Sequence, residues 1–235
     1  MNGQGNIEMN TVDLQKQSVR DLNRALHQLP EDNIQVGWEV LNPGGKHNIA
    51  CGLDRELNIR IDGHAGYYCA GMNKRADIIV AGNVGVGVAE NMMSGSVFVQ
   101  GNAGQSAGAT ARGGLLVIDG DAAARCGISM KGVDIVVKGS IGHMGAFMGQ
   151  AGRMVVCGNA GEALGDSLYE ARIYVKGSVA SLGADCVKKE MRGQHVQELQ
   201  ELLYANGLNE NVSEFTRYGS QRNLYHFQVD NALAY

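Results

Sequence analysis

Hydrophobic positions recur along the chain with a period of 19 residues. Through residues 58–185, large apolar residues stand four and two positions before a glycine, and this pattern repeats without a slip in register. A spacing of two places both apolar positions on the same face of a β-strand. The glycines that mark the repeat are Gly63, Gly82, Gly101, Gly120, Gly139, Gly158 and Gly177.

The columns around the glycine are equally regular. The residue after it is polar, the next is apolar, and the third is glycine or alanine. The column four before the glycine holds Ile59, Ile78, Val97, Leu116, Ile135, Met154 and Ile173, and the column two before it holds Ile61, Val80, Val99, Ile118, Val137, Val156 and Val175. A strand followed by a turn in each repeat is therefore predicted.

Such a repeat is the length of one coil of a β-solenoid. Coils stack at about 4.8 Å, so seven of them form a rod about 30 Å long, with the two apolar columns inside. We expect each marker glycine to adopt a turn conformation that a Cβ would disfavour, and the small third residue to let neighbouring coils approach closely. The predicted fold is an all-β solenoid over residues 58–185, between an N-terminal cap (1–57) and a C-terminal helix and tail (186–235).

Residues 78–91, IIVAGNVGVGVAEN, look like the phosphate-binding loop of a dinucleotide-binding fold. Gly82 and Gly85 nevertheless belong to two columns of the repeat. A βαβ unit needs about 30 residues, which one repeat does not supply. Dinucleotide binding is excluded on this ground.

The flanking segments predict two helices. Residues 11–29 and 194–206 have helical apolar spacing, and Gly207 follows the second helix as a C-cap. Residues 40–57 form a degenerate first coil, with Val40 in the column four before a glycine. The aromatic and basic tail, residues 215–227, suits either a partner surface or packing on its own solenoid.

An apolar column also faces outward, three residues before each glycine. A solvated sheet face alternates apolar and polar residues, whereas five consecutive outward positions here are apolar, over about 20 Å. Because two short helices are too small to hide all of this surface, we favour another subunit as its cover. The column begins with Arg60, and the candidate subunit interface is Ile79, Phe98, Val117, Val136, Val155 and Tyr174.

The composition narrows the class of protein. Of 235 residues, 34 are glycine and only 2 are proline, which fits a repeat protein rather than a disordered chain. The net charge of -4 gives no basis for binding nucleic acid or an anionic membrane. No apolar run is long enough to span a membrane, and the N-terminus has no signal-peptide pattern, so we expect a cytoplasmic protein.

No catalytic constellation emerges from the sequence. The five cysteines, at 51, 69, 126, 157 and 186, form no C-x-x-C pair, so we expect buried thiols in a reducing compartment. His64 and His143 lie about four coils apart, too far to share a metal, and Asp62 and Asp119 are three coils apart. We predict no catalytic, cofactor-binding or metal-binding residue in this chain.

The glycine pattern also resembles a known family. The coils GNAGQSAG (101–108) and GNAGEALG (158–165) are similar to the GXGXG domain, a right-handed single-stranded β-helix at the C-terminus of the large subunit of glutamate synthase. A stand-alone GXGXG chain followed by the tail segment RYGSQRNLY looks like one subunit of the three-subunit relatives of glutamate synthase, of which N-methylglutamate synthase is the best known.

The resemblance implies a non-catalytic scaffold in a larger flavoenzyme. It implies a class II glutamine-amidotransferase-like partner and a second, glutamate-synthase-like partner that binds FMN and an iron–sulfur cluster, with no cofactor on this chain. N-methylglutamate synthase makes N-methylglutamate and ammonia from glutamate and methylamine. A split glutamate synthase and a formylmethanofuran dehydrogenase subunit stay open as alternatives.

Overall fold

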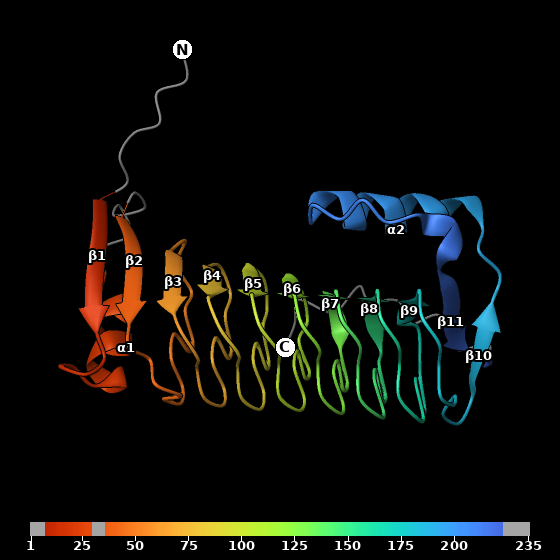
Figure 1. Cartoon of the computed structure of the whole chain (residues 1–235), viewed down its shortest axis with the longest axis horizontal. Coiled ribbons are helices and arrows are strands. Elements are labelled where there is room, and N and C mark those ends of the chain that lie inside the picture. Colours follow the sequence, from red (N-terminus) through yellow and green to blue (C-terminus); the bar gives the residue numbers. More distant parts are fainter. Residues whose placement is uncertain (1–7, 30–35, 223–235) are drawn as a thin grey trace, which may run out of the picture.

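Parallel strands stack along the long axis of the molecule as one continuous sheet (Figure 1). The computed structural model describes residues 8–29 and 36–222. The strands are β1 (Glu8–Asp13), β2 (Val36–Leu41), β3 (Asn58–Asp62), β4 (Asp77–Val80), β5 (Ser96–Val99), β6 (Leu115–Ile118), β7 (Lys131–Val137), β8 (Ala151–Val156), β9 (Arg172–Val175), β10 (Cys186–Lys189) and β11 (Thr216–Ser220). The helices are α1 (Val19–His27), α2 (Gly193–Ala205) and a short 3₁₀ helix (Val212–Glu214).

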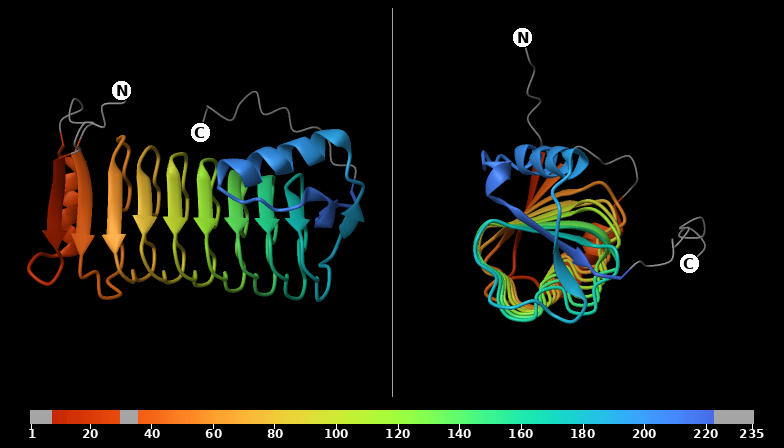
Figure 2. Two further views of the ribbon diagram at one scale, coloured as in Figure 1. Left: turned by 45° about the horizontal axis from the view of Figure 1, so that its top comes forward. Right: turned by 90° about the vertical axis from the view of Figure 1, so that its right-hand side faces the viewer.

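The predicted solenoid of about seven coils is confirmed. Each strand from β3 to β8 pairs in parallel with the next, and Ile59 aligns with Ile78 and Ile78 with Val97, as the 19-residue register requires. Viewed along the axis, the coils superpose into one closed outline (Figure 2). One irregularity interrupts the pairing of β7 with β8, between Lys131 and Asp134.

Both inward columns fill the interior of the rod. Their side chains are at most 2% exposed, from Ile59 to Val175. The apolar column two residues after the marker glycine forms a second wall, since Ala65 bridges to Val84 and the bridges continue coil by coil to Val179. Every inward position predicted from the sequence is therefore in the core.

The marker glycines serve close packing rather than a special turn conformation. Of the seven, only Gly63 has a positive φ, so the turn conformation expected at these glycines was wrong for the other six. A Cβ on Gly82 would lie 2.8 Å from the carbonyl carbon of Gly63, because consecutive coils touch at this corner. A Cβ on Gly85 would lie 2.7 Å from the same atom of Gly66, which confirms the role predicted for the small third residue.

The polar residue after each glycine has a role that the sequence did not reveal. The Asn102 backbone N–H donates to Asn83 Oδ1 at 2.8 Å, and the Asp121 N–H donates to Asn102 Oδ1 at 2.8 Å. The same bond joins neighbouring coils from His64 to Ser178, through six steps. This ladder satisfies backbone donors at the corner where the strand hydrogen bonds end.

The N-terminal helix is shorter than predicted. Residues 11–13 belong to β1, which pairs in parallel with β2 and places Val12 in the core. Helix α1 begins after Ser18, whose hydroxyl accepts the Asp21 N–H at 3.1 Å as an N-cap. Its buried Leu22 and Leu26 close one end of the core.

The first coil was predicted two residues out of register. In the structure, Val40 pairs with Ile61 and Trp38 with Ile59, so Val40 stands in the column two before the glycine. The two extra residues are accommodated at the turn after β2, where Asn42 and Gly44 have φ values of 52° and 55°. The degenerate coil therefore begins at β2 rather than at residue 40.

The C-terminal segment folds back on the solenoid. Helix α2 matches the prediction within one residue at each end, and Gly207 follows it with φ of +68°. Strand β11 then inserts between β9 and β10 and is antiparallel to both. Up to Arg222 the tail thus packs on its own chain, and residues 223–227 lie outside the described residues.

Candidate interaction surface

The outer face of the sheet is covered over its C-terminal half. Helix α2 runs along this face above the later coils (Figures 1 and 2). The side chains of Val136, Val155 and Tyr174 are fully buried and that of Val117 is 3% exposed. They form a second core with Leu199, Leu202, Leu203 and Phe215.

This cover corrects part of the predicted interface. Val117, Val136, Val155 and Tyr174 contact the C-terminal helix and tail of their own chain, so they are core residues and not a free surface for a partner. Helix α2 presents three leucines to the sheet, and Phe215 fills the remaining gap. The sequence pattern correctly located an apolar face. The prediction that another subunit covers it was wrong for these four positions, which the chain's own C-terminal segment covers.

The N-terminal half of the same column lacks this cover. Ile79 is 39% exposed and Phe98 is half-buried against the edge of the second core. The Lys138 ammonium lies 5.3 Å from the centre of the Phe98 ring, a cation–π distance. Ile79 and Phe98 remain candidates for a subunit interface. Arg60, the next residue of the column, pairs with Asp62 at 3.5 Å.

Charged contacts hold the C-terminal segment against the sheet. The Tyr174 hydroxyl donates to Glu198 of α2, and burial raises the pKa of this phenol, so the donor stays protonated. Arg172 pairs with Glu198 at 3.3 Å. Lys176 on β9 pairs with Glu210 at 2.6 Å and with Glu214 at 2.9 Å. The helix and the segment after it are therefore tied to the last coils at several points.

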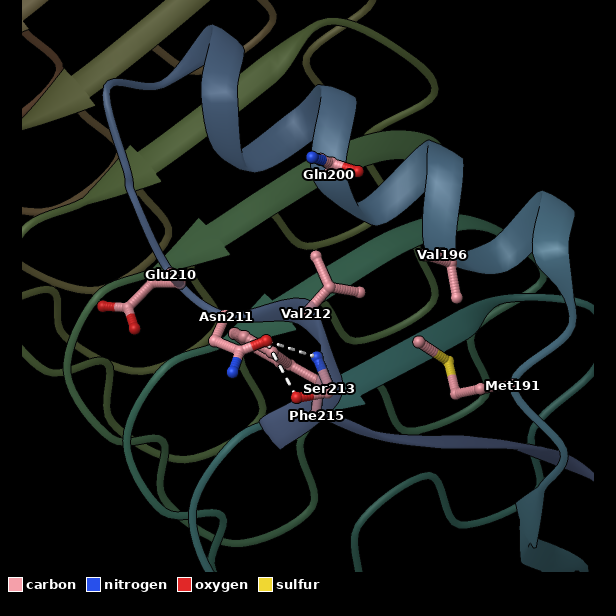
Figure 3. A pocket seen from close by; sticks show the side chains of 8 residues that line it. All are labelled: Met191, Val196, Gln200, Glu210, Asn211, Val212, Ser213 and Phe215. Carbon is pink, nitrogen blue, oxygen red and sulfur yellow. Dashed lines mark hydrogen bonds between the residues drawn. The ribbon is translucent and has the colours of Figure 1, made fainter.

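A groove lies between α2 and the return segment, which we define as residues 208–215. Its two cavities, about 570 and 430 Å³ in volume, share Gln200 and Glu210 in their linings. Figure 3 shows Val196 projecting from α2 and Val212 from the 3₁₀ helix toward the space between these elements. The walls of the two cavities are partly apolar and open to solvent. This groove is therefore a second surface that a partner segment can reach.

The solvent-exposed side of α2 was not predicted from the sequence. Val196 has helical spacing with the buried leucines of α2, but it is 38% exposed, and Tyr204 is 84% exposed. Val196, Gln200 and Tyr204 are spaced by four residues, which places them on one side of the helix. That spacing was the available signal, and it was hidden by the stronger leucine pattern.

The candidate chemical groups do not converge. Among the described residues, no three His, Cys, Asp or Glu side chains lie close enough to hold a metal ion. All five cysteines are free, and burial raises the pKa of Cys51 to about 11 and of Cys126 to about 12. Asp119 pairs with Lys138 at 2.5 Å, while Asp62 pairs with Arg60 in a distant coil.

A curated relative covers almost the whole chain. The chain is 56% identical over 228 residues to "Protein GlxC" of Rhizobium meliloti (strain 1021), spanning 97% of this chain and 100% of the relative. The chain belongs to the GlxC family. No protein-family model and no solved structure matches this GlxC-family chain. Among the described residues of this GlxC-family member, no helix is long and apolar enough to cross a membrane.

Proposed function

We propose that this chain is a non-catalytic scaffold subunit of a glutamate-synthase-like flavoenzyme complex, with N-methylglutamate synthase as the specific candidate. The observation that carries the proposal is the apolar column on the outer sheet face, whose N-terminal part, Ile79 and Phe98, is left uncovered by the chain's own helix. Exposed apolar residues on a regular sheet face mark a surface for another protein. The glycine-rich coil pattern supports the family of the complex.

The solenoid suits a bracing role. Each coil is bonded to the next through strand pairs, through the alanine-rich bridge column and through the polar ladder after the glycines. These lines of hydrogen bonds run the length of the repeat region and resist bending and shear. A partner that docks on this rod is therefore held at a fixed position relative to a second partner docked elsewhere on it.

The residues of this chain do not fit an FMN phosphate in the loop that resembles a phosphate site. The space where a Cβ would stand on Gly82 and Gly85 is filled by backbone atoms of the preceding coil, within 3 Å. At Gly87, a Glu90 carboxylate oxygen occupies the corresponding space at 2.7 Å, and its charge would repel a phosphate. FMN is therefore assigned to the partner subunit in this proposal.

The cysteines do not fit an iron–sulfur cluster either. A cluster needs several thiolates converging on one site. Cys69 and Cys126 are completely buried, and their side chains belong to the apolar core of different coils. Burial raises the pKa of both thiols, which disfavours the thiolate form that binds iron. The proposal therefore assigns the cluster to the FMN-binding partner.

Purification of the chain from its native host tests the proposal. We expect an amidotransferase-like chain and an FMN-binding chain to co-purify, with the visible spectrum of oxidised flavin. Methylamine-dependent formation of N-methylglutamate would assign the reaction to N-methylglutamate synthase. Glutamine- and 2-oxoglutarate-dependent glutamate formation would assign a split glutamate synthase, and a pterin in place of flavin would assign formylmethanofuran dehydrogenase. A colourless single chain would refute the scaffold proposal.

A further inference from the structure

The groove between α2 and the return segment has apolar residues in both of its cavities. One cavity is lined by Met191, Val196, Val212 and Phe215, and the other by Leu203, Tyr204 and Leu208. The surface of the groove offers separate positions for apolar side chains rather than one deep pocket. Such an arrangement fits a peptide segment better than a small molecule.

Amide side chains stand at the rim of these apolar positions. Gln200 lines both cavities, and its amide has no hydrogen-bond partner among the described residues. Asn211 Oδ1 accepts from the Ser213 N–H at 3.1 Å and the Ser213 hydroxyl at 2.8 Å, and the Asn211 amide nitrogen has no hydrogen-bond partner among the described residues. Amides with free donors and acceptors can pair with the backbone of an extended chain.

The charges at the groove are of one sign. The residues that line its two cavities include Glu201 and Glu210 but no lysine, arginine or histidine. Lys176, beneath the return segment, is shared by Glu210 and Glu214, so one ammonium faces two carboxylates and a negative charge is left over. The surplus favours an occupant with cationic side chains.

We propose that this groove binds an extended segment of a partner subunit that carries apolar side chains flanked by Lys or Arg. The inference rests on the proposed function, because it assigns a docking site to a member of that complex. The charge pattern argues against this chain's own remaining segments as occupants. Residues 1–7, 30–35 and 223–235 contain no lysine or arginine at all.

The test is co-purification of the complex from the native host through a tag on the full-length chain. Val196→Lys and Gln200→Lys each place a cation in the groove at an exposed site of α2, where lysine is compatible with a helix. The matched control is Val86→Lys, the same exchange at a valine that is 50% exposed on another face of the rod. Circular dichroism and a thermal melt check that all three variants fold.

We expect recovery of the partner subunits to fall at least about tenfold for each groove variant and to remain at the wild-type level for Val86→Lys. Added salt should weaken wild-type recovery, since the attraction is between exposed charges. If both groove variants recover the partners as well as the wild type, the inference is wrong and the scaffold proposal stands. It is also wrong if Val86→Lys alone disrupts assembly.

Two further outcomes separate the possible occupants. A wild-type chain that purifies without either partner refutes the scaffold proposal, and the groove assignment falls with it. A wild-type chain that forms a homodimer, with the groove variants shifted to monomer on size exclusion, identifies a second copy as the occupant and overturns the assignment to a partner subunit.

Discussion

The two halves of the outer sheet face carry the same sequence pattern and have different surroundings. From Val117 to Tyr174 the column is sealed by α2 and Phe215, whereas Phe98 lies half-buried at the edge of this cluster and Ile79 is exposed. A column pattern specifies that a face needs a cover. It does not specify whether the cover comes from the same chain, because a distant helix with three leucines satisfies the same requirement as another subunit.

A charge inside the rod should destabilise the protein more than a charge on either half of its outer face. Ile118→Asp places a carboxylate at a fully buried position in the central coils, where no cation is available. We expect a loss of more than about 4 kcal/mol in the free energy of unfolding, measured by urea denaturation. Ile118→Val, which only removes a methylene, should cost about 1 kcal/mol. A folded Ile118→Asp rod of wild-type stability would contradict the assignment of this column to the core.

A charge beneath α2 should open the sealed half of the outer face, from Val117 to Tyr174. Val136 is fully buried under α2, so Val136→Asp should release the helix while the solenoid beneath stays folded. We expect a cost of about 2–4 kcal/mol, limited by the free energy of undocking the helix. Hydrogen exchange should accelerate in residues 193–220 and stay slow in β3 to β6. Equal acceleration in both regions would mean that helix and rod unfold as one unit.

The third prediction compares a glycine of the rod with a glycine of its cover. A Cβ on Gly101 would lie 2.3 Å from Asn83 Oδ1 and 2.8 Å from the Gly82 carbonyl carbon, so Gly101→Ala must displace the neighbouring coil. We expect it to cost about 1–3 kcal/mol by thermal or chemical denaturation. Gly207→Ala meets no atom within 4 Å and has only a positive φ to accommodate, about 1 kcal/mol. A larger loss at Gly207 would reverse the interpretation of the marker glycines.

What the sequence predicted well was the part set by local repetition. The inward columns, the register from β3 to β9 and the limits of α2 depend on spacing within a few residues, and the structure confirms them. The role of the glycines required knowing which coil atoms meet across the corner, a contact between residues 19 apart. The sequence showed that the glycine was needed, but the turn conformation expected from it was wrong for six of the seven positions.

The errors arose where long-range contacts decide the outcome. Residues 11–13 had helical spacing, and pairing with β2 made them a strand. Val40 was misplaced because the extra turn residues after β2 break the period. The fate of Val136 depended on Leu199 and Leu202, more than 60 residues away along the chain. No local pattern states which distant helix will pack on a given face.

The fourth prediction uses pH to loosen the sealed half. His195 at the start of α2 is buried, and its Nδ1 accepts the Arg192 N–H at 3.1 Å. Burial, and next the positive charge of Arg217, lower the pKa of this imidazole below its ordinary 6.5, although Glu198 acts in the opposite direction. The unfolded state then binds the proton more readily, so this contribution is present at neutral pH and is lost as pH falls below about 6.5.

We expect exchange of α2 amides to accelerate more between pH 7.5 and 5.5, after correction for intrinsic rates, than exchange in the rod. His195→Gln keeps a side-chain acceptor and removes the titrating imidazole. The hydrogen-exchange protection of the α2 amides should therefore lose this pH dependence in the variant. An unchanged dependence in His195→Gln would show that the pH effect does not come from His195.

The smallest expected effect on stability lies in the open half, where the effect on assembly should be large. Ile79 is 39% exposed and already contacts solvent, so Ile79→Asp should change the free energy of unfolding by no more than about 0.5 kcal/mol. If Ile79 contacts a partner, the same charge is desolvated in the complex and co-purification of the other subunits should fall sharply. Urea denaturation and tagged co-purification measure the two effects on the same sample. If the Ile79→Asp variant retains the complete complex, the open half faces solvent in the assembly. The difference between the two halves would then have no role in binding a partner.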